Sequence, residues 1–461
     1  MSAPPPDQPR PTILALPPEL TIHIFSQLEA DPVHLPKPGA AANILAPVTL
    51  GQVCHDWRTL SRETPELWTD LRVVLGGSEE RQDWDVDAVA AFLFAWIDRS
   101  KTRGIRLSLR QDIEMYDNFP TSLIFTLLAR SAPRLEALHL EHLPHACVKD
   151  LMDGTDHGVD VVALPALKSF HISDNNIESV FRQPCSYRNL QSSPLLTDFG
   201  IIARYSFMVP KPAEFAWGRI TRLSVATLRR DDILLILGET KELVECTLRW
   251  DGRSHRALPV PNQIVLPKLE RLVLESSLTA LLLDRLILPR LWDLGISLAP
   301  GIVWLDDGVL PGLRPLAPRI TRLAVRIPEG ELPVQDSYIL APFLRAFPNV
   351  ENFIFEAPDA SQLLWHSLAS SEPMPLLRMK KLRVETWQTP AYVPLVELLE
   401  ERVQAGSCDS EEHREEYSCE RVRSFELILH GAAASRPPAV DARLYALKES
   451  GMCLRIGRAQ C

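Results

Sequence analysis

The sequence predicts an α/β solenoid preceded by a short helical module. A triplet of apolar residues recurs along most of the chain, and each triplet ends with the period-two alternation of a β-strand. Several segments between the triplets have helical patterns, so strand and return segment alternate as in a stacked repeat protein. Ahead of the triplets, the sequence predicts a compact helical module over residues 13–73.

The composition is typical of a soluble globular protein. The 461 residues are 46% hydrophobic and 23% charged, which excludes a wholly disordered or collagen-like chain. The net charge of −10 argues against the basic surface that nucleic-acid binding requires, so we expect no nucleic-acid partner. The 39 prolines, against 20 glycines, predict many short elements separated by turns.

Cysteine usage and hydropathy predict a protein of the cytoplasm or nucleus. The eight cysteines contain no CxxC pair and no zinc-ligand spacing, so we expect reduced thiols and neither a metal nor another cofactor. The start of the chain has no apolar signal segment. The most apolar stretch, LTALLLDRLILPRLW, is interrupted by Asp284, Arg285 and Pro289, so we expect no membrane span.

The N-terminal part is predicted to consist of a tail and a first helix. Residues 1–12 hold five prolines and are expected to be disordered. In the helical module, residues 13–73, a proline pair suits a first helical turn. Leu20, Ile24 and Leu28 then recur at i, i+4 and i+8 and mark one apolar stripe.

A second helix is predicted over 47–62. Its apolar face is formed by Leu50, Val53, Cys54, Trp57 and Leu60. The segment 29–43 between the helices is rich in proline and alanine and is expected to be a loop. A module this short buries too little surface to be stable alone, so its apolar faces should dock on a neighbouring element or a partner.

The repeat begins with an apolar residue, followed by another three and then five positions later. Eleven copies start 22 to 32 residues apart, except for one gap of 43, and many follow a proline. The copies are Leu135-Leu138-Leu140, Leu167-Phe170-Ile172, Leu196-Phe199-Ile201, Ile220-Leu223-Val225, Leu243-Cys246-Leu248, Leu269-Leu272-Leu274, Leu291-Leu294-Ile296, Ile320-Leu323-Val325, Val350-Phe353-Phe355, Met379-Leu382-Val384 and Val422-Phe425-Leu427. Eleven copies at this spacing predict a solenoid over 74–461.

Helices are expected in several return segments, and Trp68, Leu71 and Val73 suggest that the helical module runs directly into the repeats. The expected helices are 86–100, 121–131, 231–243 with Asp231 as N-cap, 337–347 with Ser337 as N-cap, 390–403, and 441–451 with Gly451 just after its end. The acidic, polar segment 405–420 is expected to be a mobile loop.

Residues 13–73 resemble an F-box, in the variant common in fungal proteins. The resemblance rests on LPPELTIHIFSQL and on LGQVCHDWRTLSRETPELWTDLRV, with the spacing VC..WR…..P.LW as its most specific part. The segment 29–43 is longer and richer in proline than the usual connection. The rest of the chain resembles degenerate leucine-rich repeats in an irregular arc, since of the family's regular asparagines only Asn175 is present.

The resemblance implies a receptor subunit of an SCF-type ubiquitin ligase. The F-box would bind a Skp-family adaptor, and through it a cullin–RING ligase, while the repeats would bind a protein target. The residues that fall on the apolar F-box positions are Leu16, Pro17, Leu20, Ile24, Phe25, Leu28, Leu50, Val53 and Trp57. Each belongs either to the adaptor interface or to the core of the module. The alternative is a non-catalytic interaction scaffold whose F-box does not engage a cullin complex.

No catalytic arrangement is expected. The chain has no Gly-rich phosphate loop, GxSxG or HExxH motif. The cluster His139, His142, His145 and Cys147 is better explained by exposed structural histidines than by zinc. The acids in DWDVD (83–87) are better explained by the start of a helix than by calcium binding.

The outward positions of the strands predict a protein-binding surface. Seven basic and eight acidic residues occupy them, a mixture that suits a protein partner better than nucleic acid. The candidate target-binding residues are Arg222, Arg249, Arg271, Arg322, Arg326 and Arg383.

Overall fold

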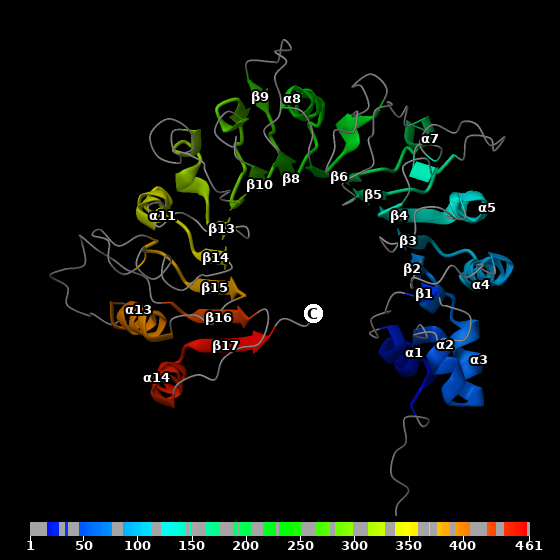
Figure 1. The fold of residues 1–461 in the computed structure, drawn as a ribbon, viewed down its shortest axis with the longest axis horizontal. Coiled ribbons are helices and arrows are strands. Elements are labelled where there is room, and N and C mark those ends of the chain that lie inside the picture. Colours follow the sequence, from blue (N-terminus) through cyan, green and yellow to red (C-terminus); the bar gives the residue numbers. More distant parts are fainter. Residues whose placement is uncertain are drawn as a thin grey trace, which may run out of the picture. The chain divides into compact units, whose positions relative to one another are not determined.

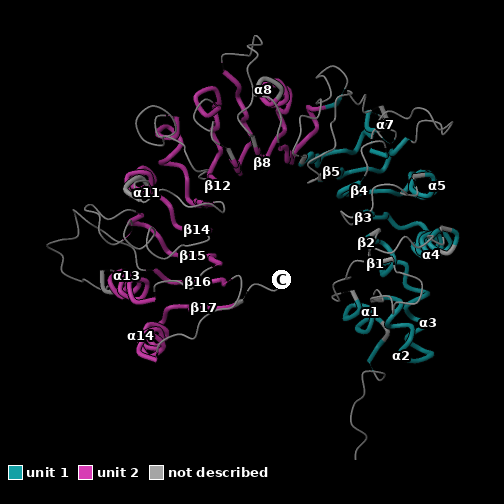
Figure 2. The backbone as a smooth tube through the Cα atoms, in the orientation of Figure 1, with its two compact units in different colours: residues 1–216 teal, residues 217–461 magenta. Residues whose placement is uncertain are grey.

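The computed structural model consists of short parallel strands joined by helices and turns (Figure 1). The chain divides into two compact units, residues 1–216 and residues 217–461 (Figure 2). The structure describes residues 16–26, 33–35, 46–75, 86–111, 121–143, 147–148, 151, 163–174, 188–191, 193–203, 215–226, 230–250, 263–276, 282–297, 312–327, 337–357, 368, 376–387, 392–405, 422–429 and 438–458.

Unit 1 contains the N-terminal helices followed by a parallel sheet. Its strands, adjacent in chain order, are β1 (Val33–Leu35), β2 (Asp70–Leu75), β3 (Ile105–Gln111), β4 (Leu135–Glu141), β5 (Ser169–Asp174) and β6 (Asp198–Ala203). Its helices are α1 (Pro18–Ser26), α2 (Ala46–Val53), α3 (His55–Glu63), α4 (Val86–Arg99), α5 (Thr121–Ser131) and α7 (Arg188–Gln191), with the 3-10 turns η2 (Pro65–Trp68) and η3 (Ala132–Arg134). Helices α4 and α5 lie on one side of the sheet (Figure 1).

Unit 2 is likewise built from parallel strands with helical segments between them. Its main sheet contains β7 (Arg222–Ala226), β8 (Glu245–Trp250), β10 (Arg271–Ser276), β12 (Asp293–Ser297), β13 (Arg322–Arg326), β14 (Asn352–Ala357), β15 (Lys381–Thr386), β16 (Ser424–Leu429) and β17 (Cys453–Arg458). A separate pair is formed by β9 (Ile264–Val265) and β11 (Leu286–Ile287). The helical segments are η5 (Trp217–Arg219), α8 (Arg230–Glu239), η6 (Ala317–Arg319), α11 (Ser337–Arg345), α13 (Tyr392–Ala405) and α14 (Pro438–Glu449), and α8, α11, α13 and α14 lie on one side of the main sheet (Figure 1).

The apolar triplets form the core of both units. In each of the eleven predicted copies all three residues are buried. Their middle residues pair directly across neighbouring strands: Leu294 pairs with Leu323 and Leu323 with Phe353. Because strand side chains alternate between faces, this register brings every triplet to the same side of the sheet. The predicted succession of a helical N-terminal part and a long run of parallel strands is confirmed.

A proline turn introduces many of the strands. The N–H of Leu269 donates to the carbonyl of Leu266, and the N–H of Leu291 donates to the carbonyl of Leu288, both at 3.4 Å. A proline lies at the second position of each turn, where its fixed φ suits the turn. The abundance of proline in the sequence is thus partly explained by the repeat itself.

In most repeats of unit 2, one backbone carbonyl accepts two N–H groups from the next repeat. The Val244 carbonyl accepts from Glu270 (2.9 Å) and Arg271 (3.1 Å), and the Glu270 carbonyl accepts from Trp292 and Asp293 (both 3.1 Å). The same paired bonds recur at the carbonyls of Thr221, Trp292, Thr321, Glu351 and Lys380. Because only backbone groups take part, the stacking tolerates any residue there except proline, which lacks the N–H donor.

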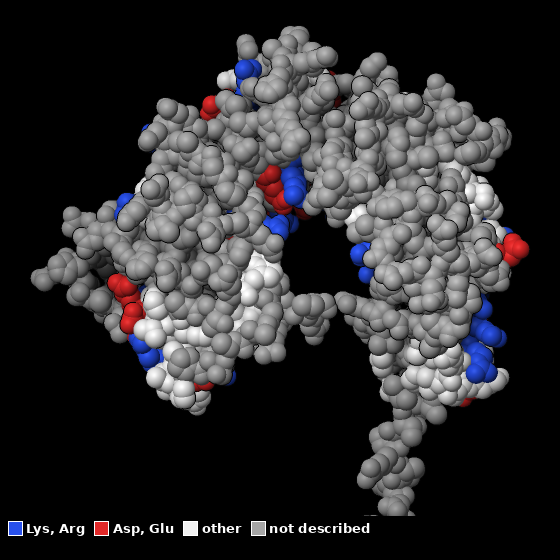
Figure 3. Space-filling view, viewed as in Figure 1, with Lys and Arg blue, Asp and Glu red and all other residues white. Residues whose placement is uncertain are grey.

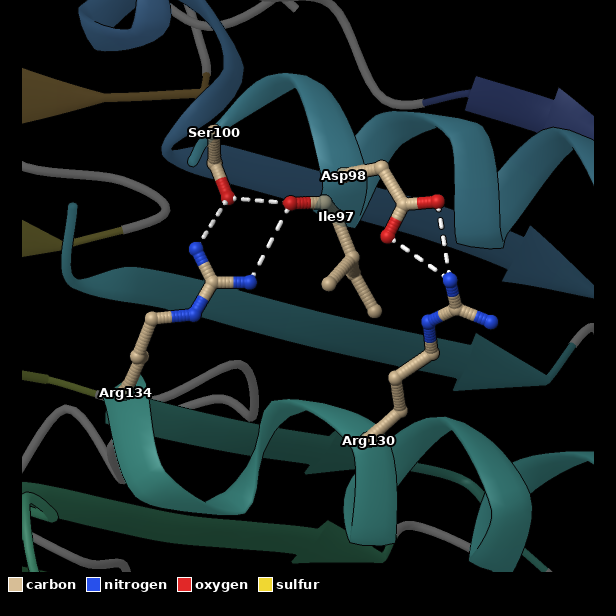
Figure 4. A network of polar contacts seen from close by, with 5 residues as sticks. All are labelled: Ile97, Asp98, Ser100, Arg130 and Arg134. Carbon is tan, nitrogen blue, oxygen red and sulfur yellow. Dashed lines mark hydrogen bonds and ion pairs between the residues drawn. The ribbon is translucent and has the colours of Figure 1, made fainter. Parts of the chain in front are cut away.

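Side chains also connect neighbouring repeats. At the end of α4, Arg134 donates to the carbonyl of Ile97 (3.2 Å) and to the hydroxyl of Ser100 (3.0 Å). Arg130 of α5 donates to both carboxylate oxygens of Asp98 at 2.8 Å (Figure 4). The last carbonyls of a helix lack partners within the helix, so Arg134 caps α4 from the following repeat.

The structure corrects two predictions for the N-terminal module. The single helix predicted over 47–62 is divided into α2 and α3, because Cys54 is extended (φ −155°, ψ 175°) and acts as the N-cap of α3. The segment 29–43, predicted to be a loop, contains strand β1, which pairs in parallel with β2. β-Branched Val33 and the alternating VHL sequence suit a short edge strand.

The other helix predictions need smaller changes. Asp231 lies inside α8 and is not its N-cap, because the helix begins one residue earlier. Gly451 has φ +92° and its N–H donates to the Lys448 carbonyl, as predicted for a residue that follows a helix. The predicted tail 1–12 and the acidic loop 405–420, apart from Ala405, lie outside the described residues. Among the described helices, none combines the length and apolarity needed to cross a membrane.

Replacement of Phe353 by alanine tests the shared core of unit 2. Phe353 is buried, so Phe353→Ala should lower the free energy of unfolding by about 3–5 kcal/mol. Ile354→Ala, on the opposite face of the same strand, is the matched control and should cost much less. Chemical denaturation measures both, and equal losses would contradict this assignment of the core face.

The ion pair between α13 and α14 predicts a pH-dependent stability term. Glu400 accepts from Arg443 at 2.9 and 2.6 Å, and these hydrogen bonds lower the pKa of Glu400 below its ordinary value of 4.5. Stability from the pair is therefore full above pH 4.5 and is lost as pH falls through the lowered pKa. Glu400→Gln should cost up to about 1 kcal/mol at neutral pH and progressively less in acid.

Thermal unfolding of Glu400→Gln across this pH range measures the effect. Glu401→Gln, an exposed neighbour on the same helix, is the control and should follow the wild-type curve. A Glu400→Gln deficit that stays constant down to strongly acidic pH would contradict the linkage.

Candidate functional site

The first helix carries both exposed and buried apolar side chains. Leu20 and Ile24 are 52% and 40% exposed, whereas Phe25 is 2% exposed. Residues four apart lie on the same face of a helix, so Leu20 and Ile24 form one exposed stripe. Leu16 and Pro17, which precede the helix, are exposed as well.

The break at Cys54 gives the second helical segment the same division. The Cys54 sulfur accepts the N–H of Trp57 at 3.5 Å and so caps the start of α3. Leu50 is 6% exposed and Val53, at the end of α2, is 59% exposed. The predicted common apolar face of 47–62 is therefore wrong, since Leu50 and Val53 differ in environment.

An aromatic pair holds α1 against α3. The rings of Phe25 and Trp57 meet edge to face with centroids 4.8 Å apart. Such a pair adds to the energy of burial, so the buried Phe25 and Leu50 belong to the core of the module and the half-buried Trp57 lies at its edge. Leu28 lies outside the described residues.

Trp68 joins the module to the repeats of unit 1. It is buried, and its indole N–H donates to the Ser61 carbonyl at 2.7 Å. Its ring packs edge to face on Trp96 of α4, with the two ring centroids 4.6 Å apart. The Arg99 guanidinium lies 4.5 Å from the Trp68 ring centroid. Arg103 of the next repeat also pairs with Glu66. These contacts attach the helices directly to the sheet.

The exposed apolar set of the module consists of Leu16, Leu20, Ile24 and Val53. Among the described residues only eleven large apolar side chains are exposed, and four of them are concentrated in this set. Scattered exposed apolar residues are ordinary, so the concentration of four on one small module makes it a candidate interaction surface. Sequence reasoning selected all four without separating them from core residues.

A second candidate surface lies on the strand face of unit 2, where acidic and basic side chains adjoin (Figure 3). Asp293 pairs with Arg271 at 3.5 Å and with Arg322 at 3.4 Å. Its carboxylate is 6% exposed, while the two arginine side chains are 48% and 37% exposed. Burial raises the pKa of Asp293, and the two guanidiniums act in the opposite direction.

The other predicted target-binding arginines lie on the same face. Arg326 reaches Glu275 (3.8 Å) and Glu356 (3.7 Å), and burial and the nearby Glu385 raise the pKa of Glu356. Arg383 pairs with Glu385 at 2.6 Å and with Glu426 at 3.5 Å. Arg222 and Arg249 are exposed on β7 and β8. The structure thus gathers all six arginines on one sheet, interleaved with carboxylates.

The histidine-rich segment does not form a metal site among the described residues. His139 is exposed, and its ring packs edge to face on that of His171 with centroids 4.9 Å apart. The Nε2 atom of His171 lies 3.0 Å from Oδ1 of Asp198. Desolvation and the neighbouring His171 lower the pKa of His139. His142 lies in the following turn, Cys147 is buried, and His145 is outside the described residues.

The acids of the DWDVD segment give no evidence for calcium. Asp87 lies in the first turn of α4 and is exposed, as expected for an acid at a helix start. Asp83 and Asp85 lie outside the described residues.

Sequence reasoning missed one feature of the strand face. Val273, Ala324 and Ile354 are apolar residues at outward positions, in the register row that also contains Gly295. The sequence did contain a signal for this feature, because each of these residues is apolar at a strand position where the alternation predicts a polar residue. The charged residues at neighbouring outward positions obscured it.

Comparison with known proteins identifies the N-terminal module. A family model described as F-box-like matches residues 13–73, so this part of the chain is an F-box-like domain. No match was found among curated proteins. A solved structure from Bacteroides fragilis, a structural genomics target, is similar at 10% identity over 87% of this chain and 76% of its own, with a TM-score of 0.25.

Two substitutions test the separation of core from exposed set. Phe25→Ala should lower the free energy of unfolding by about 3–5 kcal/mol, because it leaves a cavity beside Trp57. Leu20→Ala should stay within about 0.5 kcal/mol of wild type, because Leu20 packs little in the free chain. Denaturant titration of each variant measures both, and a large loss for Leu20→Ala would assign it to the core.

Proposed function

We propose that this chain, whose residues 13–73 form an F-box-like domain, is a substrate receptor of an SCF-type ubiquitin ligase. The observation that carries the proposal is the division of the module's apolar residues. Phe25 and Leu50 are buried and the half-buried Trp57 packs on Phe25, while Leu20 and Val53 face solvent although nothing in the described part of the fold requires apolar residues there.

The exposed apolar set is suited to a helical partner. F-box domains generally bind Skp-family adaptors, and apolar anchors at helical spacing are the usual means by which one helix docks on another. A few central anchors carry most of the energy of such an interface. In this proposal Leu16, Leu20, Ile24 and Val53 contact the adaptor, which connects the chain to a cullin–RING ligase.

The remaining part of the chain would hold the target protein. Parallel repeats, which we interpret as degenerate leucine-rich repeats, present one extended strand face with mixed charge. The receptor would perform no chemistry itself. It would act by proximity, because holding a target beside a loaded ubiquitin-conjugating enzyme raises their effective concentration. We place this activity in the cytoplasm or nucleus.

A second candidate function is an interaction scaffold without a cullin complex. It is favoured by the segment 29–43, whose length and strand β1 depart from the usual connection within an F-box. β1 joins the module to the sheet through β2 and could change how the helices are presented to an adaptor.

Capture of a purified Skp-family adaptor tests the proposal. The immobilised full chain should retain the adaptor, and Leu20→Asp or Val53→Asp should weaken retention at least about 30-fold, since loss of an anchor costs at least about 2 kcal/mol. Leu195→Asp, at a similarly exposed leucine of unit 1 outside the module, is the matched control.

The adaptor and cullin together separate the two candidate functions. Retention of both supports the receptor, and retention of the adaptor without the cullin supports the scaffold. Retention unaffected by Leu20→Asp, with the variant folded by circular dichroism, would refute the exposed apolar set as the docking surface.

A further inference from the structure

Unit 2 presents a strip of apolar side chains on the sheet face opposite its core. Val273, Ala324 and Ile354 lie in one register row across β10, β13 and β14, and each remains partly exposed. Because side chains alternate along a strand, these residues point away from the buried triplets. We name these three residues the apolar strip.

A cluster with excess positive charge adjoins the strip. Arg271 and Arg322 flank the carboxylate of Asp293, and Glu245 lies across from Arg271 on its other side. The register row contains three basic and two acidic residues, in the order Arg222, Glu245, Arg271, Asp293 and Arg322. The carboxylate is nearly enclosed while both guanidiniums keep contact with solvent, so an incoming ligand meets cations first. Arg271 is two residues before Val273, and Arg322 is two residues before Ala324.

We propose that this face binds an extended acidic peptide segment of the target protein. A peptide carboxylate lies between Arg271 and Arg322, and an apolar side chain two residues along lies on the apolar strip. This inference rests on the proposed function, since it names the class of target segment that the receptor holds.

The spacing and the charge both favour this ligand. Outward residues two apart on a strand are separated by about 7 Å, and so are alternate side chains of an extended peptide. A guanidinium donates in a planar fork that matches a carboxylate, and two such groups around one anion give a directed site. Nearby Glu275 and Glu356 interrupt the positive charge, which disfavours a nucleic-acid backbone.

The test measures fluorescence anisotropy of the full-length chain with a short labelled peptide of repeating Glu-Ser-Val-Ser. Saturable binding is expected, with at least about ten-fold weaker binding of the peptide that carries Gln in place of Glu. Arg271→Gln or Arg322→Gln should weaken binding of the Glu peptide about ten-fold. Arg314→Gln, at an exposed arginine outside the sheet strands, should leave it unchanged.

Two further variants separate ligand binding from a structural role of the cluster. Asp293→Asn removes the carboxylate that competes with the peptide, so it should strengthen binding of the Glu peptide several-fold. Ile354→Ser should weaken binding several-fold through the apolar strip alone. A merely structural cluster would predict weaker or unchanged binding for Asp293→Asn.

Several results would overturn the inference. These are the absence of saturable binding, equal affinity for the Glu and Gln peptides, or weaker binding by folded Asp293→Asn. Binding of a phosphoserine peptide without binding of the Glu peptide would also overturn it, in favour of a phosphorylated ligand. The peptide assay contains no adaptor, so it is independent of the adaptor-capture experiment. Peptide binding without adaptor capture rejects only the proposed ligase role. Adaptor capture without peptide binding rejects only this inference.

Discussion

The structure depends on stacking apolar triplets in register on one side of a parallel sheet. Each strand buries its triplet against those of its neighbours, as Leu294, Leu323 and Phe353 do, so no repeat has a complete core alone. The paired N–H bonds to a single carbonyl, such as that of Glu270, maintain this register with backbone atoms. The remaining outward positions are therefore free to vary.

The N-terminal module depends on this sheet for part of its own stability. Trp68 is enclosed between Ser61 of the module and Trp96 of the first repeat, and β1 adds a strand beside β2. A module of this size buries little surface by itself, and these contacts supply the missing core. The exposed apolar set is then left available while the rest of the module is held in place.

On the strand face of unit 2, arginines differ in the number of carboxylates with which they pair. Arg271 and Arg322 are held by one buried carboxylate, whereas Arg383 lies between two carboxylates, those of Glu385 and Glu426. The same residue types are therefore paired differently at two places on one strand face. Surface ion pairs contribute little to stability, so their arrangement mainly sets the local charge of this face.

The sequence by itself determined the repeated strands, most return helices and the F-box resemblance, because triplet periodicity and turn residues act over short distances. It could not separate Leu20 from Phe25, or Val53 from Leu50, since exposure depends on which helix packs where. The break at Cys54 and strand β1 in 29–43 were also decided by tertiary packing. Likewise, only strand register could bring Asp293 between two arginines that are distant in the chain, because charge pairing across strands leaves no local pattern.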